Sequence, residues 1–314
     1  MNDVLRDRVR GCAVGAAVGD ALGMPLEFGS KIPTTALVRE MTGGPLPAGA
    51  FTDDTEMALA LSDSLLAHRP LDPADLADRF VAWLQSKPRD VGIHTGSVLY
   101  QIAAGEPWDR VAESVLRRRP DSAGNGSMMR CWPIAVAHWN DLDLLVSESR
   151  LQSRVTHPHP DCIEGCVFVN SAIYYLLRGL LPAEAIARAM THADLSPEMQ
   201  KVIRSAPRKP RDALENSGWV RHAVESVVWG MRTWDSFEEI VVQVANLGND
   251  ADTSAAIVGA MAGAVYGLSA IPDRWLAELH GEWPLRSGTI WTSEDFVALA
   301  DRLAETGENE PAGR

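Results

Sequence analysis

The stretch LGNDADTSAAIVGAM, residues 247–261, places two aspartates directly ahead of a run of small apolar residues. Such a run predicts a tightly packed helix, since small side chains let neighbouring backbones approach closely. A glycine inside a helix costs about 1 kcal/mol relative to alanine, so its repetition needs a packing reason. Here glycine recurs at every fourth position, along nearly one stripe of the helix, at Gly259, Gly263 and Gly267. The sequence therefore predicts a central helix that begins with two carboxylates, Asp250 and Asp252.

The rest of the chain also has a helical apolar pattern, with spacings near i, i+3, i+4 and i+7. The predicted helices are Val4–Ala21, Thr55–Ala67, Pro73–Gln85, Pro107–Arg117, Ser127–Trp139, Asp161–Leu180, Pro182–Thr191, Trp219–Thr233, Ser236–Ala245, Thr253–Leu268 and Glu294–Leu303. Alternating β-rich runs are scarce. We therefore predict an all-α fold, a compact orthogonal bundle of many helices, as a single domain over 1–304 with a disordered tail over 305–314. The loops at 29–52 and 86–96 are long, which is typical of functional or mobile segments.

Composition limits the partners of the chain. Its 314 residues are 46% hydrophobic and 23% charged, which is enough for a sizeable core. The 42 acidic and 29 basic residues give a net charge of −13, which argues against nucleic-acid or anionic-membrane binding. Four cysteines are too few for a disulfide scaffold, and no uninterrupted apolar run reaches the ~18 residues of a membrane span. We expect a cytoplasmic monomer.

A second acidic cluster opens another predicted helix, at FTDDTEMALALSDSLL, residues 51–66. One interpretation is local: Asp53 and Glu56 have the spacing of a capping box, and acidic residues favour the first turn of a helix. The other interpretation joins this cluster to Asp250 and Asp252. If the two helix starts meet, their carboxylates repel one another by roughly 4 kcal/mol per close pair, so counter-cations are needed. All-oxygen ligands select hard ions such as Mg²⁺, Mn²⁺ or Ca²⁺.

Several shorter motifs admit both a structural and a functional interpretation. Glycines in SAGNGSMMR, residues 122–130, precede a predicted helix and form either a phosphate-binding loop or an ordinary turn. In RVTHPHPDCIEGC, residues 154–166, the spacing does not resemble a zinc site, so His157 is better interpreted as a pocket residue. Glu27 follows a proline after a predicted helix, and Asp90 lies in a loop that contains proline and glycine. Each of them is either a surface residue or an acid–base group.

Taken together, these motifs resemble those of the ADP-ribosylglycohydrolase family, which includes ADP-ribosylarginine hydrolases, the dinitrogenase-reductase-activating glycohydrolase and J1-type lens crystallins. The matching stretches come in the order of the family and cover about residues 11–270. They are GCAVGAAVGDALGMPLEF, FTDDTEMAL, RDVG with a following Thr95, GNGSMMR, THPHPD, NSGWVRHAVESVVWGM and GNDADTSAAIVGAMAGAVYG. The pair of T-D-D and G-N-D-A-D-T is the most specific part.

The resemblance implies a helical bundle with a binuclear metal cleft. By position, the ligands of two divalent cations, Mg²⁺ or Mn²⁺, are Thr52, Asp53, Asp54, Asp250, Asp252 and Thr253. The positions that match the substrate-binding residues are Gly124, Asn125, Gly126, Ser127, His157 and Trp219. Glu27 and Asp90 match acidic residues near the metals and the scissile bond. Two positions depart from the family pattern: Trp219 replaces a frequent tyrosine, and Ile93-His94 follows DVG where arginine-type relatives tend to have asparagine.

The resemblance implies hydrolysis of the bond between ribose C1″ and a modified protein side chain, most often an arginine nitrogen, with ADP-ribose as product. The metals would orient the ribose and activate water, and Asp90 or Glu27 would handle the proton. Alternatives are a hydrolase of O-linked (serine) ADP-ribose, poly-ADP-ribose or an ADP-ribosylated small molecule, and a catalytically silent, crystallin-like ADP-ribose-binding protein. The presence of all six metal-site residues disfavours the last alternative.

Overall fold

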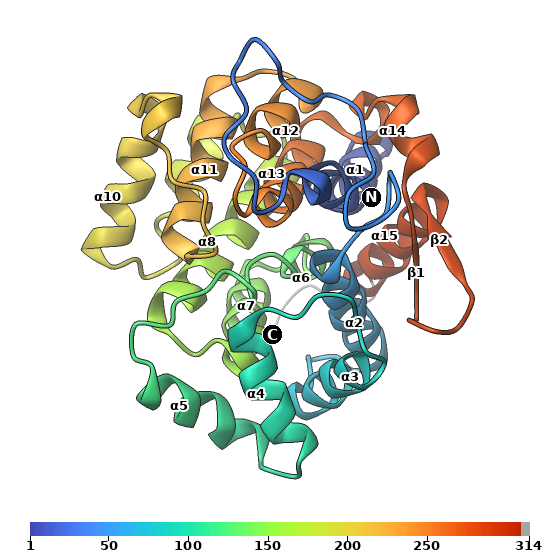
Figure 1. Cartoon of the computed structure of the whole chain (residues 1–314), viewed down its shortest axis with the longest axis vertical. Helices are drawn as coiled ribbons and strands as arrows, with labels where there is room; N and C mark the ends of the chain where they lie inside the picture. Colours follow the sequence, from blue (N-terminus) through green and yellow to red (C-terminus); the bar gives the residue numbers. More distant parts are fainter. Residues whose placement is uncertain (309–314) are drawn as a thin grey trace.

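The computed structural model describes residues 1–308, and in this range the chain is almost entirely helical (Figure 1). The helices are α1 (Asp3–Gly23), α2 (Asp53–Ala67), α3 (Pro73–Gln85), α4 (Ile93–Ala103), α5 (Trp108–Arg118), α6 (Trp132–Ala137), α7 (Leu142–Thr156), α8 (Pro160–Leu177), α9 (Pro182–Ala189), α10 (Pro197–Ser205), α11 (Val220–Thr233), α12 (Phe237–Ala245), α13 (Ala251–Tyr266), α14 (Asp273–Glu278) and α15 (Ser293–Glu308). Four 3₁₀ turns, η1 to η4, lie at Met24–Leu26, Ala206–Arg208, Arg211–Ala213 and Leu268–Ala270. The strands β1 (His280–Glu282) and β2 (Ile290–Thr292) pair as one antiparallel hairpin. The all-α prediction is confirmed.

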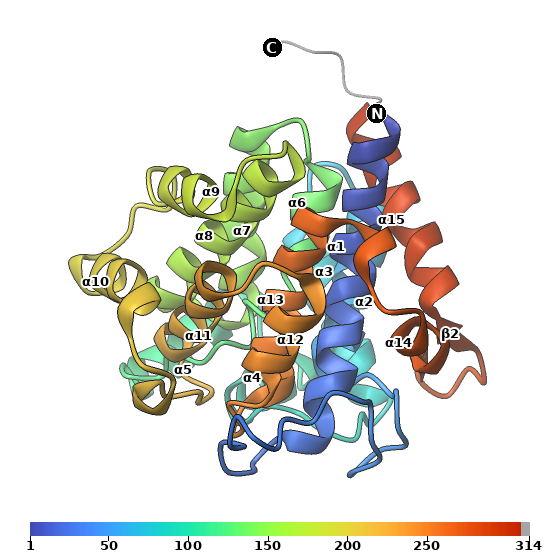
Figure 2. The ribbon, with the colours of Figure 1, turned by 90° about the horizontal axis from the view of Figure 1, so that it is seen from above.

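The centre of the bundle is an antiparallel pair made by α1 and α13, which lie side by side although they come from opposite ends of the sequence (Figure 2). Gly15 faces Gly259 and Gly11 faces Gly263, so closely that a Cβ atom on any of them would overlap the opposing backbone. From residue 11 to its end α1 is buried on all sides, and α13 is buried over residues 251–264, as expected of helices in the interior. This contact is the packing reason that the glycine stripe of α13 requires.

The antiparallel arrangement brings the end of α1 to the beginning of α13. A Cβ atom on Gly23, the last residue of α1, would overlap the backbone of Asp252. The short turn η1 follows Gly23 directly and delivers Glu27 beside the first turn of α13. The central helix pair thus assembles one side of the acidic site.

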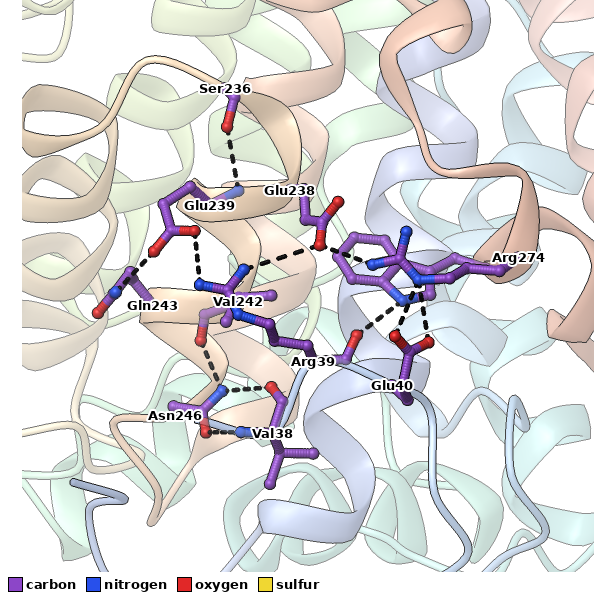
Figure 3. Close-up of polar contacts among 11 residues, drawn as sticks. Val38, Arg39, Glu40, Ser236, Glu238, Glu239, Val242, Gln243, Asn246 and Arg274 are labelled. Atoms are coloured by element: carbon purple, nitrogen blue, oxygen red, sulfur yellow. Dashed lines mark hydrogen bonds and ion pairs between the residues drawn. The ribbon is translucent and has the colours of Figure 1, made fainter. Parts of the chain in front are cut away.

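The long loop over residues 29–52 is fixed to the body of the protein at its middle (Figure 3). The side-chain amide of Asn246 accepts from the N–H of Val38 at 2.7 Å and donates to its carbonyl at 2.8 Å, as a neighbouring strand would. Arg39 pairs with Glu239 at 2.8 Å. The loop therefore crosses α12 at a defined place.

A second set of contacts ties the same loop to α14. The indole N–H of Trp275 donates to the carbonyl of Arg39 at 3.0 Å, and Arg274 bridges Glu40 and Glu238 (Figure 3). Because the loop begins next to Glu27 and ends at residue 52, these anchors help to hold both of its ends at the acidic site.

Four helices were absent from the sequence prediction: α4, α7, α10 and α14. The reason is clearest for α7, whose buried face is mostly polar. A search for apolar residues at helical spacing therefore does not detect this helix. The buried polar residues of α7 are Glu148, Ser149, Gln152, Ser153 and Thr156. The predicted helix over 127–139 was too long, since residues 126–130 form a turn and α6 covers only 132–137.

The predicted end of the domain was also too early. Helix α15 continues through residues 305–308, so the disorder predicted there is wrong, and the remainder of that segment lies outside the described residues. Within residues 1–308, no helix combines the length and apolar character needed to cross a membrane.

Candidate functional site

The two acidic helix starts converge on one cavity of about 480 Å³. It lies where the first turns of α2 and α13 meet η1 and the loop before α4. Its acidic lining consists of Glu27, Asp53, Asp54, Asp90, Asp250 and Asp252. Stretches almost 200 residues apart in the sequence thus place their carboxylates around one space, as the second interpretation of the aspartate pairs predicted.

The start of α13 is held by Asn216. Asp250 donates its N–H to the carbonyl of Asn216 at 2.8 Å, and the Asn216 amide donates to the carbonyls of Gly248 and Asp250 at 2.8 and 3.1 Å. The Oδ1 atom of Asn216 accepts from Ser254 at 2.7 Å. Because these bonds fix the turn, the carboxylate of Asp250 is not required as a cap and instead accepts from Asn125 at 2.5 Å.

The start of α2 is capped from another helix. The buried carboxylate of Asp20, in α1, accepts from the N–H and hydroxyl of Thr52 at 2.9 and 2.8 Å. It also accepts from the N–H and hydroxyl of Thr55 at 3.2 and 2.5 Å. These are the donors that a local N-cap would satisfy. The capping-box interpretation of Asp53 and Glu56 is therefore wrong, and Asp53 lines the cavity instead.

Like charges crowd at the centre of the cavity. Glu27, Asp250 and Asp252 each offer an oxygen within 4.8 Å of the others. Two carboxylates at that separation repel by roughly 3 kcal/mol at an effective dielectric near 20. Burial, followed by the charges of Asp90 and Asp250, raises the pKa of Glu27 to about 7.

Burial also raises the pKa of four aspartates of the cavity, Asp53, Asp54, Asp250 and Asp252. Burial, and next to it the negative charge of Asp252, raises the pKa of Asp54 well above its ordinary value. The Oδ1 atom of Asp54 is buried and accepts no hydrogen bond from residues 1–308. An orphaned carboxylate oxygen among crowded carboxylates fits a bound hard cation, whose charge would compensate theirs. The donor set of the cavity therefore fits the divalent metals that the sequence suggested.

The glycine-rich segment forms another wall of the same cavity. Gly124, Asn125 and Gly126 line it, and the N–H of Gly126 has no acceptor among the described residues. A Cβ atom on Gly126 would come within about 3.0 Å of the ring of His157, so a larger residue there would require the ring to shift. Ser127 does not line the cavity: its hydroxyl is buried against Ser153 at 2.8 Å, and the structure gives it a packing role.

A hydrogen-bond chain fixes the protonation of His157. The buried guanidinium of Arg130 donates to the Thr156 hydroxyl at 2.7 Å, and this hydroxyl lies 2.7 Å from Nδ1 of His157. The hydroxyl accepts from Arg130, and Nδ1 of His157 is the one acceptor that residues 1–308 offer to its own proton, so the hydroxyl donates to Nδ1 and the ring carries its N–H at Nε2. Burial, and then the charges of His94 and Arg130, lowers the pKa of His157 well below its ordinary value. His157 thus presents a neutral Nε2–H donor on the cavity wall.

Trp219 lies outside the acidic cavity. It is 39% exposed and lines a neighbouring cavity of about 580 Å³, together with Gly124 and Gly218. The two cavities share these glycines as lining residues, and residues 124 and 219 form an isolated antiparallel bridge there. A ligand that extends from the acidic cavity along this bridge would reach the face of Trp219.

The other predicted residues occupy the edges of the acidic cavity. Thr253 lines it, whereas Thr52 lines an adjoining cavity and donates its hydroxyl to Asp20. Asp90 is exposed at the border shared by the two cavities.

Sequence reasoning missed three groups that build the site: Asp20, Asn216 and Arg130. Asp20 carried a signal, because it is a lone carboxylate in an otherwise apolar, glycine-rich helix. Asn216 and Arg130 act through contacts far along the chain, which local patterns do not report.

Comparisons with known proteins agree with this architecture. The family model of ADP-ribosylglycohydrolase matches residues 1–312. ADP-ribosyl-dinitrogen reductase glycohydrolase of Rhodospirillum rubrum is 33% identical, over 88% of this chain and 91% of that protein. ADP-ribosylarginine hydrolase Tri1 of Serratia proteamaculans is also 33% identical, over 87% of this chain and 75% of that protein. A solved structure of an ADP-ribosylglycohydrolase-related protein complex superposes with a TM-score of 0.79 at 35% identity, covering 98% of this chain and all of that one.

These matches define the class of protein as a glycohydrolase. The chain belongs to the ADP-ribosylglycohydrolase family.

Proposed function

We propose that the protein removes ADP-ribose from modified proteins by cleaving the bond between ribose C1″ and an arginine nitrogen. The observation that carries the proposal is the convergence of the acidic starts of α2 and α13, with Glu27, on a cavity that shares Gly124 and Gly218 with the neighbouring cavity of Trp219. The names of the relatives from Rhodospirillum rubrum and Serratia proteamaculans support this substrate class, since both describe release of ADP-ribose and one specifies arginine.

In this proposal two divalent cations, Mg²⁺ or Mn²⁺, are held by Thr52, Asp53, Asp54, Asp250, Asp252 and Thr253. Such cations supply charge that orients the ribose hydroxyls and lowers the pKa of water. The six residues are the ones whose uncompensated carboxylates and neighbouring hydroxyls fit that role.

The remaining residues bind and orient the substrate. The free N–H of Gly126 and the Nε2–H of His157 suit the diphosphate or ribose oxygens, and Asn125 holds Asp250 in place. Trp219 offers a partly exposed indole on which adenine can stack. Binding the nucleotide remotely leaves binding energy for the reacting centre.

The reacting bond would lie near Glu27 and Asp90. Water adds its oxygen to C1″ as the C1″–N bond breaks, through an oxocarbenium-like state. Water gives up one proton, and the departing guanidine nitrogen takes up one. Glu27 lies beside Asp250 and Asp252 in the same cavity and is a carboxyl group positioned for such a proton transfer. Asp90, at the border of the two cavities, is the second carboxylate within the same space.

The proposal predicts metal-dependent release of free ADP-ribose from an arginine-modified protein. Asp252→Asn keeps the size of the side chain but removes its charge, and we expect a loss of about 100-fold or more in kcat/KM, equivalent to ~2.7 kcal/mol. The assay compares wild type and variant with Mn²⁺ and with EDTA, and circular dichroism verifies that the variant is folded.

Parallel reactions with serine-linked ADP-ribose and poly-ADP-ribose test the linkage. Full activity of Asp252→Asn, or equal activity in EDTA, contradicts the metal-site assignment. Release from the serine-linked substrate alone would assign a different leaving group to the same site.

A further inference from the structure

A second cavity adjoins the acidic one and has no role in holding the nucleotide. Its volume is about 710 Å³, and it shares Glu27, Phe28, Asp53 and Asp90 with the acidic cavity. None of the glycine loop, His157 or Trp219 lines it. A ligand whose nucleotide part occupies the acidic cavity and the Trp219 side therefore leaves this space for the other half of the scissile bond.

Glu56 is a buried carboxylate on the wall of this second cavity. It is 8% exposed and lies one helical turn beyond Asp53 in α2. The indole N–H of Trp83 donates to its Oε2 atom at 2.7 Å and thereby fixes the carboxyl group. Its Oε1 atom accepts no hydrogen bond from residues 1–308. Because Asp20 caps α2, Glu56 is not used at the helix start and remains free to bind a ligand.

No cationic side chain among residues 1–308 pairs with Glu56. Lys87, Arg89 and Arg286 line the same cavity, but none of them is paired with Glu56, and Arg89 donates to the carbonyl of Pro45. A buried carboxylate without a positive partner is unfavourable, so an incoming donor with a positive charge is the matching ligand.

The other walls fit an aliphatic chain that ends in such a donor. Leu46, Pro47, Phe51 and Leu285 form apolar surface in the same cavity. A divalent cation fits less well, because the indole N–H of Trp83 lies beside the carboxylate, where a metal would need another oxygen ligand.

We infer that this cavity receives the modified residue of the target protein, and that Glu56 binds the free N–H groups of its guanidinium. The inference rests on the proposed function, in which the bond to arginine lies near Glu27 and Asp90, with the metal ligand Asp53 beside them in both cavities. Asp53 and Glu56 are i and i+3 neighbours and lie on the same face of α2. A ribose beside Asp53 would therefore place the attached guanidinium beside Glu56. A serine-linked substrate has no donor for Glu56 and would leave the carboxylate buried and unpaired, so the cavity selects for arginine.

Glu56→Gln tests the inference, because the amide retains the size of the side chain and an oxygen for Trp83. We expect KM for an arginine-linked ADP-ribosyl peptide to rise about tenfold or more, while kcat changes about twofold or less, as charge-assisted hydrogen bonds predict. The inhibition constant of ADP-ribose, which occupies only the nucleotide side, should stay unchanged. Glu164→Gln is the matched control: Glu164 is equally buried, at 8% exposed, and its Oε2 atom accepts from the N–H of Ser196 at 2.9 Å, but it lines neither cavity.

A binding experiment separates failure of the inference from failure of the proposed function. Agmatine, which carries the guanidinium of arginine on an aliphatic chain, is titrated into wild type, Glu56→Gln and Glu164→Gln with Mg²⁺ and ADP-ribose present, and binding is followed by saturation-transfer NMR. We expect binding to wild type and Glu164→Gln, with about tenfold weaker binding to Glu56→Gln. Absence of hydrolysis by wild type refutes the proposed function but leaves this result interpretable. Equal binding of agmatine by wild type and Glu56→Gln, no binding by wild type, or an unchanged KM overturns the inference.

Discussion

At the scale of single residues, buried polar groups decide which side chains are available at the site. Asp20 accepts all four hydrogen bonds from Thr52 and Thr55, so the aspartates that open α2 are not needed as caps. Arg130 acts in a similar way on the other side of the cavity. It is fully buried, contacts the ring of Phe80 at 4.2 Å and donates to Thr156, which sets the tautomer of His157.

The first prediction concerns the charge of His157. A histidine in the unfolded chain titrates near pH 6.5, and the folded pKa is well below that, so only the unfolded state gains this proton as the pH falls through about 6.5. The contribution of His157 to stability is therefore present above that pH and is lost below it. Long-range ¹H–¹⁵N NMR should show a neutral ring with the proton on Nε2 at pH 7 and still at about pH 5.5.

Thr156→Val is the matching variant, because it removes the hydroxyl and keeps the shape. We expect loss of the single Nε2–H tautomer and a destabilisation of about 1–3 kcal/mol from the unpaired groups of Arg130 and His157. A protonated His157 ring in the wild type at pH 6 would contradict the proposed hydrogen-bond chain.

At the scale of elements, the pair α1–α13 controls the position of the site. The two backbones approach closely because glycines face each other along both helices. Any side chain in this stripe would push the helices apart, and the displaced end of α13 carries Asp250 and Asp252. The glycines that weaken each helix locally are thus required by the contact between them.

The second prediction is that Gly259→Ala destabilises the protein although alanine is the better helix former. Its Cβ atom would overlap the carbonyl oxygen of Gly15, and we expect a loss of about 2–4 kcal/mol in the free energy of unfolding, measured by urea denaturation. Gly96→Ala in α4 is the control, because the nearest heavy atom to its Cβ would be a methyl of Val91 at 3.4 Å. It should be neutral or stabilise by up to about 1 kcal/mol. Equal effects of the two substitutions would show that close packing of α1 and α13 is not the cause.

At the scale of the whole molecule, the site joins parts of the chain that are remote in sequence. The end of α1, the start of α2 and the start of α13 each contribute carboxylates, and the anchors on the loop over 29–52 hold that loop against the bundle (Figure 3). Without compensating positive charge, the repulsion at the cavity opposes this assembly.

The third prediction is that divalent metal stabilises the whole fold. A ligand that binds only the folded state at 100 times its Kd adds about 2.7 kcal/mol, which for a chain of this size raises Tm by about 4 °C. Differential scanning calorimetry should show this shift on adding Mn²⁺ or Mg²⁺ to the EDTA-treated protein, and a smaller one for Asp252→Asn. Identical melting curves with and without metal would argue against cations in the cavity.

The sequence by itself determined the helical class, the two glycine-rich central helices, the family and the two acidic helix starts. It could do so because each of these features is a pattern within one short stretch of sequence. The patterns are the helical periodicity, the stripes of small residues, and the T-D-D and G-N-D-A-D-T motifs. The same local reasoning failed for α7, whose packed face is polar, and for the capping box at Asp53, whose role falls to a residue of α1.

Only the tertiary structure decided how those elements meet. It set the antiparallel contact of α1 with α13, the capping of α2 by Asp20, the chain from Arg130 to His157, and the exposure of Glu56 to a second cavity. Each of these depends on a contact between residues far apart along the chain. Such contacts are fixed by close packing and by the need to pair buried polar groups, and no local pattern records them.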